Sequence, residues 1–193
     1  MKLSSPQTYK VVRFALEARR FKQLEAQKAT GVSFGLVNRV TQWMVSRKFV
    51  GEEAGGYRVI APAALAQTFS VFRRMEDLRS GAYTLNVDAI ALNSLLKKHG
   101  AVFCLSSALP YYDDYFKDPV VQVYGSDLLK KALFKLPAGR RTRVEVYEDD
   151  LQDRDDIVSE KGVNRTTKMR TIVDLLCSER AYAADQLIKK TWG

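Results

Sequence analysis

The chain has 193 residues, with 31 Lys and Arg residues against 22 Asp and Glu residues, and its formal net charge is +9. A hydrophobic fraction of 46% beside a charged fraction of 27% is typical of a globular protein and excludes intrinsic disorder. No apolar run reaches the roughly 18 residues that span a bilayer, and we expect neither a signal peptide nor a membrane partner. Cys104 and Cys177 cannot form a metal cluster alone, and the single His99 lies in a helix-end sequence, which argues against a His-rich metal site or a Ser-His-Asp triad. We therefore expect a cytoplasmic protein with two buried cysteines, no metal and no cofactor.

The positive charge is concentrated before residue 81. Residues 1–80 contain 14 basic and 6 acidic residues, a net charge of +8, whereas residues 81–193 contain 17 basic and 16 acidic residues, a net charge of +1. This asymmetry is typical of an amino-terminal unit that binds a polyanion, and nucleic acid is the usual one. A basic surface that only maintains solubility is the alternative, so charge alone does not assign a function.

Helical periodicity predicts three helices near the amino terminus, over residues 8–20, 21–28 and 34–48. In the second of them Leu24 and Ala29 are expected to point inward. Between the second and third, Gly31 suits the left-handed end of a helix. Ser33 suits an N-cap whose hydroxyl accepts a backbone hydrogen bond from the next turn.

The third predicted helix has one apolar and one polar side. Its expected core stripe consists of Leu36, Val37, Val40, Trp43 and Met44. The opposite side lacks acidic residues and carries Gly35, Asn38 and Gln42, flanked by Phe34, Arg39, Thr41 and Ser46. Asn and Gln can bond bidentately to adenine and Arg to guanine, and a small residue such as Gly35 lets the backbone approach a duplex. The pattern is typical of a helix that reads bases in a DNA groove.

A predicted β-hairpin follows, because short β-like runs at residues 49–50 and 57–60 flank a turn at Gly55 and Gly56. Three helices followed by a hairpin are the element order of a winged helix-turn-helix domain. The sequence resembles winged-helix transcription regulators, including those of the MarR-like and archaeal type. The resemblance rests on residues 30–33, 36–40, 44 and 55–59.

In such regulators the third helix enters the major groove, and the hairpin, or wing, contacts the backbone or the minor groove. The resemblance implies this role for Asn38, Arg39, Gln42 and Arg58. With the polar pattern it gives a DNA-binding set of Ser33, Phe34, Gly35, Asn38, Arg39 and Gln42, with phosphate contacts from Arg19, Arg20, Lys22, Lys28 and Arg58. Glu52 and Glu53 would repel phosphate, which favours a wing that touches DNA at Arg58 or not at all. A winged helix used for protein interaction or dimerisation is the alternative.

A linker helix is predicted over residues 62–79, ended by Gly81. Pro62 suits its first turn, and an apolar face recurs at Leu65, Phe69, Phe72 and Met75. This face is expected to pack on one of the two domains, and a homodimer contact is the alternative. The predicted organisation is a winged helix domain over residues 1–61, a linker helix over 62–80 and a second domain over 81–193.

From residue 81 onward, helices and strands alternate, which predicts a small α/β domain. Strands are expected at residues 102–105, 119–124, 143–147 and 157–158. Helices are expected to start at residue 86 or 88, at 106, 128, 167 and 181. The fold class is therefore α/β (α+β), with an amino-terminal winged helix-turn-helix and a small carboxy-terminal α/β domain.

Several segments of the chain together resemble the AbiEi antitoxin-type regulators. After the winged helix these are VFCLSSAL at residues 102–109, VQVY at 121–124, VEVY at 144–147, TIVDLL at 171–176 and AYAADQL at 181–187. Residues 104–107 replace the family's Thr-Gly step. The resemblance implies a DNA-binding repressor that regulates its own operon and counteracts a nucleotidyltransferase-like toxin, which would be its protein partner.

An enzyme is the alternative from another class. Gly125-Ser126-Asp127 follows a predicted strand, and nucleotidyltransferases use such a step to hold a triphosphate, with paired acids that hold magnesium. Glu148 and Asp150 have the required spacing of two, whereas the position two after Glu145 is a tyrosine. We favour a helix cap at residue 126 or 127 and a solvated acidic loop over residues 149–156, and we expect no catalytic residue. Three acids that converge on a cleft there would support a nucleotidyltransferase-like or nuclease-like enzyme. The third possibility is an adaptor whose carboxy-terminal domain binds a protein partner.

Overall fold

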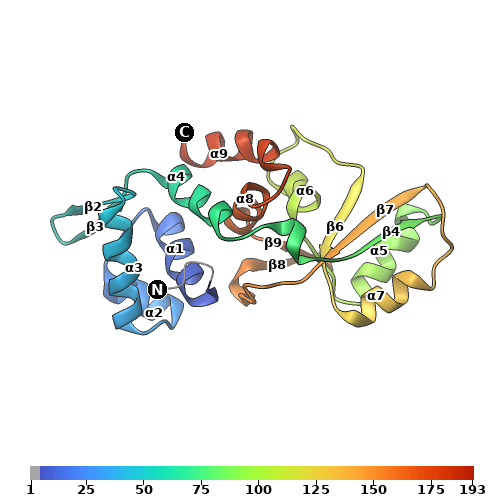
Figure 1. The fold of residues 1–193 in the computed structure, drawn as a ribbon, viewed down its shortest axis with the longest axis horizontal. Coiled ribbons are helices and arrows are strands. Elements are labelled where there is room, and N and C mark those ends of the chain that lie inside the picture. The colour runs from blue at the N-terminus through green and yellow to red at the C-terminus, as the bar shows by residue number, and fades with distance from the viewer. Residues whose placement is uncertain (1–4) are drawn as a thin grey trace.

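The computed structural model describes residues 5–193 and has the mixed α/β composition that the sequence predicts (Figure 1). The stretch in which we expected no signal peptide begins in residues 1–4, which lie outside the described residues. Across the described part of the chain, no helix combines the length and the apolar character needed to cross a membrane.

The amino-terminal part consists of helices around a small antiparallel sheet. Its elements are α1 (Pro6–Ala18), β1 (Arg20–Phe21), α2 (Gln23–Thr30), α3 (Phe34–Ser46), β2 (Val50–Glu53) and β3 (Gly56–Val59), and the sheet order is β1-β3-β2. Gly31 ends α2 in the left-handed conformation with φ of 66°, as predicted. Ser33 is the N-cap residue of α3, but its hydroxyl accepts no capping hydrogen bond within residues 5–193. The predicted position of the cap is therefore confirmed and its predicted hydrogen bond is wrong.

The core stripe of α3 is confirmed, since Val37, Val40 and Met44 are fully buried. Three other predicted orientations are wrong. Thr41 is buried rather than part of the polar side, because its hydroxyl donates to the Val37 carbonyl within the same helix at 2.9 Å and so needs no water. Leu24 is 60% exposed and Ala29 is exposed as well, because the short helix α2 directs Ala26 into the core instead.

The predicted linker helix is wrong in extent. Helix α4 covers Pro62–Gln67, 3-10 turns follow at Thr68–Val71 and Met75–Leu78, and strand β4 (Arg79–Leu85) contains Gly81. The backbone N–H of Met75 donates to the Cys177 carbonyl on another element, at 2.9 Å, in place of the bond that a continued helix would make. Phe72 is consequently 53% exposed and does not belong to the apolar face.

Within residues 5–193 the larger sheet is six-stranded and mixed, with the order β4-β7-β6-β5-β9-β8. Its further strands are β5 (Val102–Phe103), β6 (Val120–Tyr124), β7 (Thr142–Tyr147), β8 (Ile157–Glu160) and β9 (Val163–Thr166). The four strands predicted from the sequence are confirmed. The sequence did not predict β4, whose first residue was assigned to the linker helix, or β9, whose polar residues give no apolar run.

The two faces of this sheet differ in chemistry. Helices α5 (Ala89–Lys98) and α7 (Asp127–Phe134) cover one face, where Val144 and Val146 of β7 join an apolar cluster (Figure 1). Asp88 and Ser126 cap these two helices with their side chains. The opposite face is buried but polar and aromatic. It carries Gln122 and Tyr124 from β6, in register with Glu145 and Tyr147 from β7.

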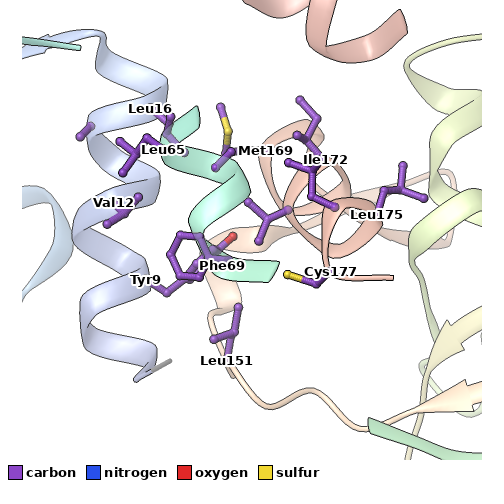
Figure 2. Packing of buried hydrophobic residues seen from close by; sticks show 14 of the residues in the cluster. Tyr9, Val12, Leu16, Leu65, Phe69, Leu151, Met169, Ile172, Leu175 and Cys177 are labelled. Atoms are coloured by element: carbon purple, nitrogen blue, oxygen red, sulfur yellow. The ribbon is translucent and has the colours of Figure 1, made fainter. Parts of the chain in front are cut away.

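Helices α6 (Leu105–Ala108), α8 (Lys168–Leu176) and α9 (Asp185–Trp192), with the 3-10 turn Ala181–Ala184 before α9, complete the chain. One buried apolar cluster runs from α1 through α4 to α8. Figure 2 shows Val12 and Leu16 of α1 facing Leu65 and Phe69, with Ile172 of α8 beyond them. This cluster crosses the predicted boundary at residue 61, so the amino-terminal helices and the connector pack on the carboxy-terminal part. The two cysteines are buried and free, as predicted.

The acidic segment at residues 149–156 is not the solvated loop that we predicted. It folds onto arginines from α1, the connector and α8, which together form a buried arginine–aspartate network. Its members are Arg13, Arg73, Arg170, Asp149, Asp150, Asp153, Asp156 and Asp174. Arg170 lies 2.8 Å from Asp174 and 3.0 Å from Asp149. The network fastens α1 to α8 through charge as well as through apolar packing.

Candidate nucleic-acid interface

The polar side of α3 faces solvent. Gly35, Asn38, Arg39 and Gln42 are all exposed, whereas the opposite side of the helix is buried. Arg39 makes no ion pair and no hydrogen bond with any other residue in the range 5–193. The side chains of Arg39 and Gln42 are therefore free to bind a ligand that approaches α3 from outside.

Asn38 is held in place by a residue that the sequence did not single out. The side-chain amide of Gln23, the first residue of α2, donates to Asn38 Oδ1 at 3.1 Å and to the Tyr57 hydroxyl at 3.2 Å. The Tyr57 ring stacks on Phe21 with 5.6 Å between the ring centroids. Gln23 thus ties α2, α3 and the hairpin together at the centre of the exposed face. Its position at the start of a short helix gave no periodic signal.

The hairpin brings two of the predicted phosphate contacts side by side. Arg20 and Arg58 are opposite each other in the pairing of β1 with β3. Glu53 lies between them, with Oε1 2.6 Å from Arg58 Nε and Oε2 3.4 Å from Arg20 Nε. Glu52 is exposed and makes no ion pair in the described part of the chain. The two glutamates that we grouped together therefore differ, since one neutralises the arginines and the other points to solvent.

The remaining predicted contacts surround α3 unevenly. Ser33 and Phe34 are exposed at its amino-terminal end, and Phe34 shares an open hollow with Lys22, Leu24 and the hairpin. Arg19 lines a different hollow, together with Arg20 and Arg58. Lys28 is exposed on the last turn of α2 and lines neither hollow. The structure therefore brings Lys22 and Phe34 together beside α3, places the three arginines around the hairpin and leaves Lys28 apart.

The acids near Gly125 do not converge on a cleft. Glu145 is 1% exposed and accepts hydrogen bonds from the Tyr147 hydroxyl at 2.9 Å and the Gln122 amide at 3.1 Å. Burial by itself raises the pKa of the Glu145 carboxyl, but these hydrogen bonds and the nearby arginines outweigh it and lower the pKa. Arg73 binds Asp150 at 2.9 Å. Residues 5–193 contain no group of three His, Cys, Asp or Glu side chains placed to hold a metal ion.

A scan against protein-family models and searches of curated proteins and of solved structures found no match to the chain. The likeness to winged-helix regulators and to AbiEi antitoxins therefore stays a prediction.

Proposed function

We propose that this protein is a sequence-specific regulator that binds double-stranded DNA, with α3 as the helix that reads bases. The observation that carries the proposal is the exposed side of α3. Asn38, Arg39 and Gln42 stand one helical turn or less apart on a face that has no acidic side chain. Amide and guanidinium groups of this kind bond to adenine and guanine edges in the major groove.

Basic residues beside α3 support the same proposal. Lys22 is the N-cap residue of α2 and Lys28 lies on its last turn. Arg19 ends α1, and Arg20 of β1 pairs with Arg58 of the hairpin. Contacts of such side chains with phosphate position a protein on the duplex and supply affinity that does not depend on sequence. The net charge of +8 over residues 1–80 is in keeping with this role.

The finer proposal is that the protein is an AbiEi-like antitoxin, a cytoplasmic repressor that regulates its own operon and counteracts a nucleotidyltransferase-like toxin. It is supported by the sequence resemblance over residues 102–187. A toxin protein and a second copy of the chain would then be its partners beside DNA. Growth of cells that express the neighbouring gene with and without this protein tests the antitoxin role, because a toxin must arrest growth in the absence of this chain.

Selection of duplexes from a random-sequence pool, followed by gel shift, tests the proposal that α3 reads bases. Asn38→Ala and Gln42→Ala are each expected to weaken binding to the selected duplex by about 5- to 150-fold, since a bidentate base contact contributes about 1–3 kcal/mol. Binding to an unrelated duplex should change little, because the base contacts are absent there.

The matched control is Asn93→Ala, which removes an exposed amide from α5, on the far part of the molecule. It should leave both affinities unchanged. If both α3 variants bind every duplex as tightly and as selectively as the unmodified protein, α3 does not read bases.

A further inference from the structure

Glu53 holds the position that a phosphate would take between two arginines. Its two carboxylate oxygens each face a guanidinium, one from β1 and one from β3, at 3.4 and 2.6 Å. Guanidinium groups bind phosphate oxygens with the same geometry as carboxylate oxygens. The pair of arginines is therefore already arranged for an anion with two oxygens.

The fold sets the backbone positions from which the two arginines reach Glu53. Arg20 and Arg58 are a directly opposed pair of the antiparallel ladder, next to the pair formed by Phe21 and Tyr57. The close approach of β3 to β1 requires glycine at position 56, because a Cβ there would lie 2.7 Å from the Phe21 carbonyl oxygen. The register that opposes the two arginines therefore depends on backbone packing.

The site is open to a ligand from outside. Arg20 lines two hollows at the surface, one with Lys22, Glu25 and Glu53 and the other with Arg19 and Arg58. The side chains of Arg20 and Arg58 are 71% and 50% exposed. In the first hollow Lys22 adds a second cation, and Glu25 already accepts a hydrogen bond from the backbone N–H of Lys22 at 2.9 Å. Both arginines face the single carboxylate of Glu53, so a backbone phosphate that replaces it leaves the balance of charge at this pair unchanged.

We propose that Arg20 and Arg58 form a phosphate clamp that Glu53 occupies in the free protein, so that Glu53 competes with the DNA backbone for the hairpin. The inference rests on the proposed DNA-binding function and names a phosphate site within it. Glu53 has to leave the clamp whenever the hairpin binds DNA. It therefore weakens binding to every duplex by the same factor, and tight binding then needs the base contacts of α3.

The test is the affinity of Glu53→Gln for the selected duplex and for an unrelated duplex, measured across a range of salt concentrations. Both affinities should rise together, by about two- to fivefold, as expected for the loss of one exposed ion pair. The plot of the logarithm of the binding constant against the logarithm of the salt concentration should become steeper by about 0.9, the change expected for one phosphate contact.

Two controls separate the clamp from a general loss of negative charge. Glu52→Gln removes the same charge from the same hairpin but from a residue without an ion pair, and it should raise affinity less and leave the salt slope nearly unchanged. In an Arg58→Ala background the clamp is gone. There, Glu53→Gln should raise the affinity for the duplexes no more than Glu52→Gln does. Equal effects of the two glutamine variants in the unmodified background would overturn the clamp while leaving DNA binding in place. Absence of salt-sensitive binding to any duplex would overturn the proposed function and the clamp with it.

Discussion

Two polar regions of the molecule both contain arginine, but one exposes it without a partner and the other buries it among carboxylates. On α3, Arg39 is exposed and has no ion pair within residues 5–193. In the arginine–aspartate network, Arg170 is 1% exposed and lies within 4 Å of four carboxylates. A buried charge is tolerated when other charges and hydrogen bonds replace water around it, whereas an unpaired one at the surface keeps its water until a ligand arrives. The comparison indicates that the network serves the fold and that α3 serves binding.

The two regions are also connected. Arg13 of α1 lies 3.4 Å from Asp153 and 3.5 Å from Asp156, and α1 in turn packs on the helices that carry the exposed face. The network therefore sets how the amino-terminal helices sit on α8. Loss of the network should disturb the whole molecule, whereas loss of a side chain on α3 should disturb binding alone.

The largest expected effect is that of Arg170→Met, which removes the charge at the centre of the network. It leaves Asp174 and Asp149 with fewer partners in a buried site, and removal of one partner from a buried ion pair costs about 3–5 kcal/mol. Chemical denaturation should show a loss of this size in the free energy of unfolding.

Arg39→Met is the matched control, because it makes the same exchange on an exposed helix surface. It should change the free energy of unfolding by less than about 0.5 kcal/mol and yet weaken binding to the selected duplex. An equal loss in the free energy of unfolding for Arg170→Met and Arg39→Met would contradict the assignment of the network to the fold and of α3 to binding.

A smaller effect is expected from Asp156, whose carboxyl titrates inside the network. Burial raises the pKa of Asp156 from 3.8 to about 6, although Arg170 and Arg13 act in the opposite direction. Between pH 4 and 6 the folded protein therefore holds a proton that the unfolded chain releases. The contribution of Asp156 to stability is present below pH 4 and is lost as the pH rises through 6.

Asp156→Asn keeps the side chain neutral at every pH and should remove this loss. Relative to the unmodified protein, the variant should gain on the order of 3 kcal/mol between pH 4 and 7, since two pKa units correspond to about that free energy. Denaturation curves over this range measure the difference, and parallel stability profiles for the two proteins would contradict the raised pKa.

The sequence predicted most elements, because periodicity and capping residues are local signals. Val144 and Val146 alternate with Glu145 along β7, and Asp88 and Ser126 mark the starts of α5 and α7. The extent of the linker helix was predicted wrongly. Met75 bonds to Cys177, a residue about a hundred positions away, and periodicity carries no information about such a partner.

The two polar regions also differ in how well the sequence predicted them. The exposed side of α3 follows from the wheel of a single helix, and Asn38 and Gln42 lie where that wheel places them. The network was missed because Arg13, Arg73 and Arg170 come from three distant segments and meet the acidic segment only in the folded chain. Acidic runs are usually solvated, so nothing local distinguished this one.

The most direct test of α3 as the helix that reads bases is a titration of the isotope-labelled protein with the selected duplex, followed by backbone amide resonances. The account predicts that the amides of Gly35, Asn38 and Gln42 shift most, together with those of the hairpin, while the amides of α5 and α7 stay in place. Large shifts confined to α5 and α7, with α3 unaffected, would contradict it.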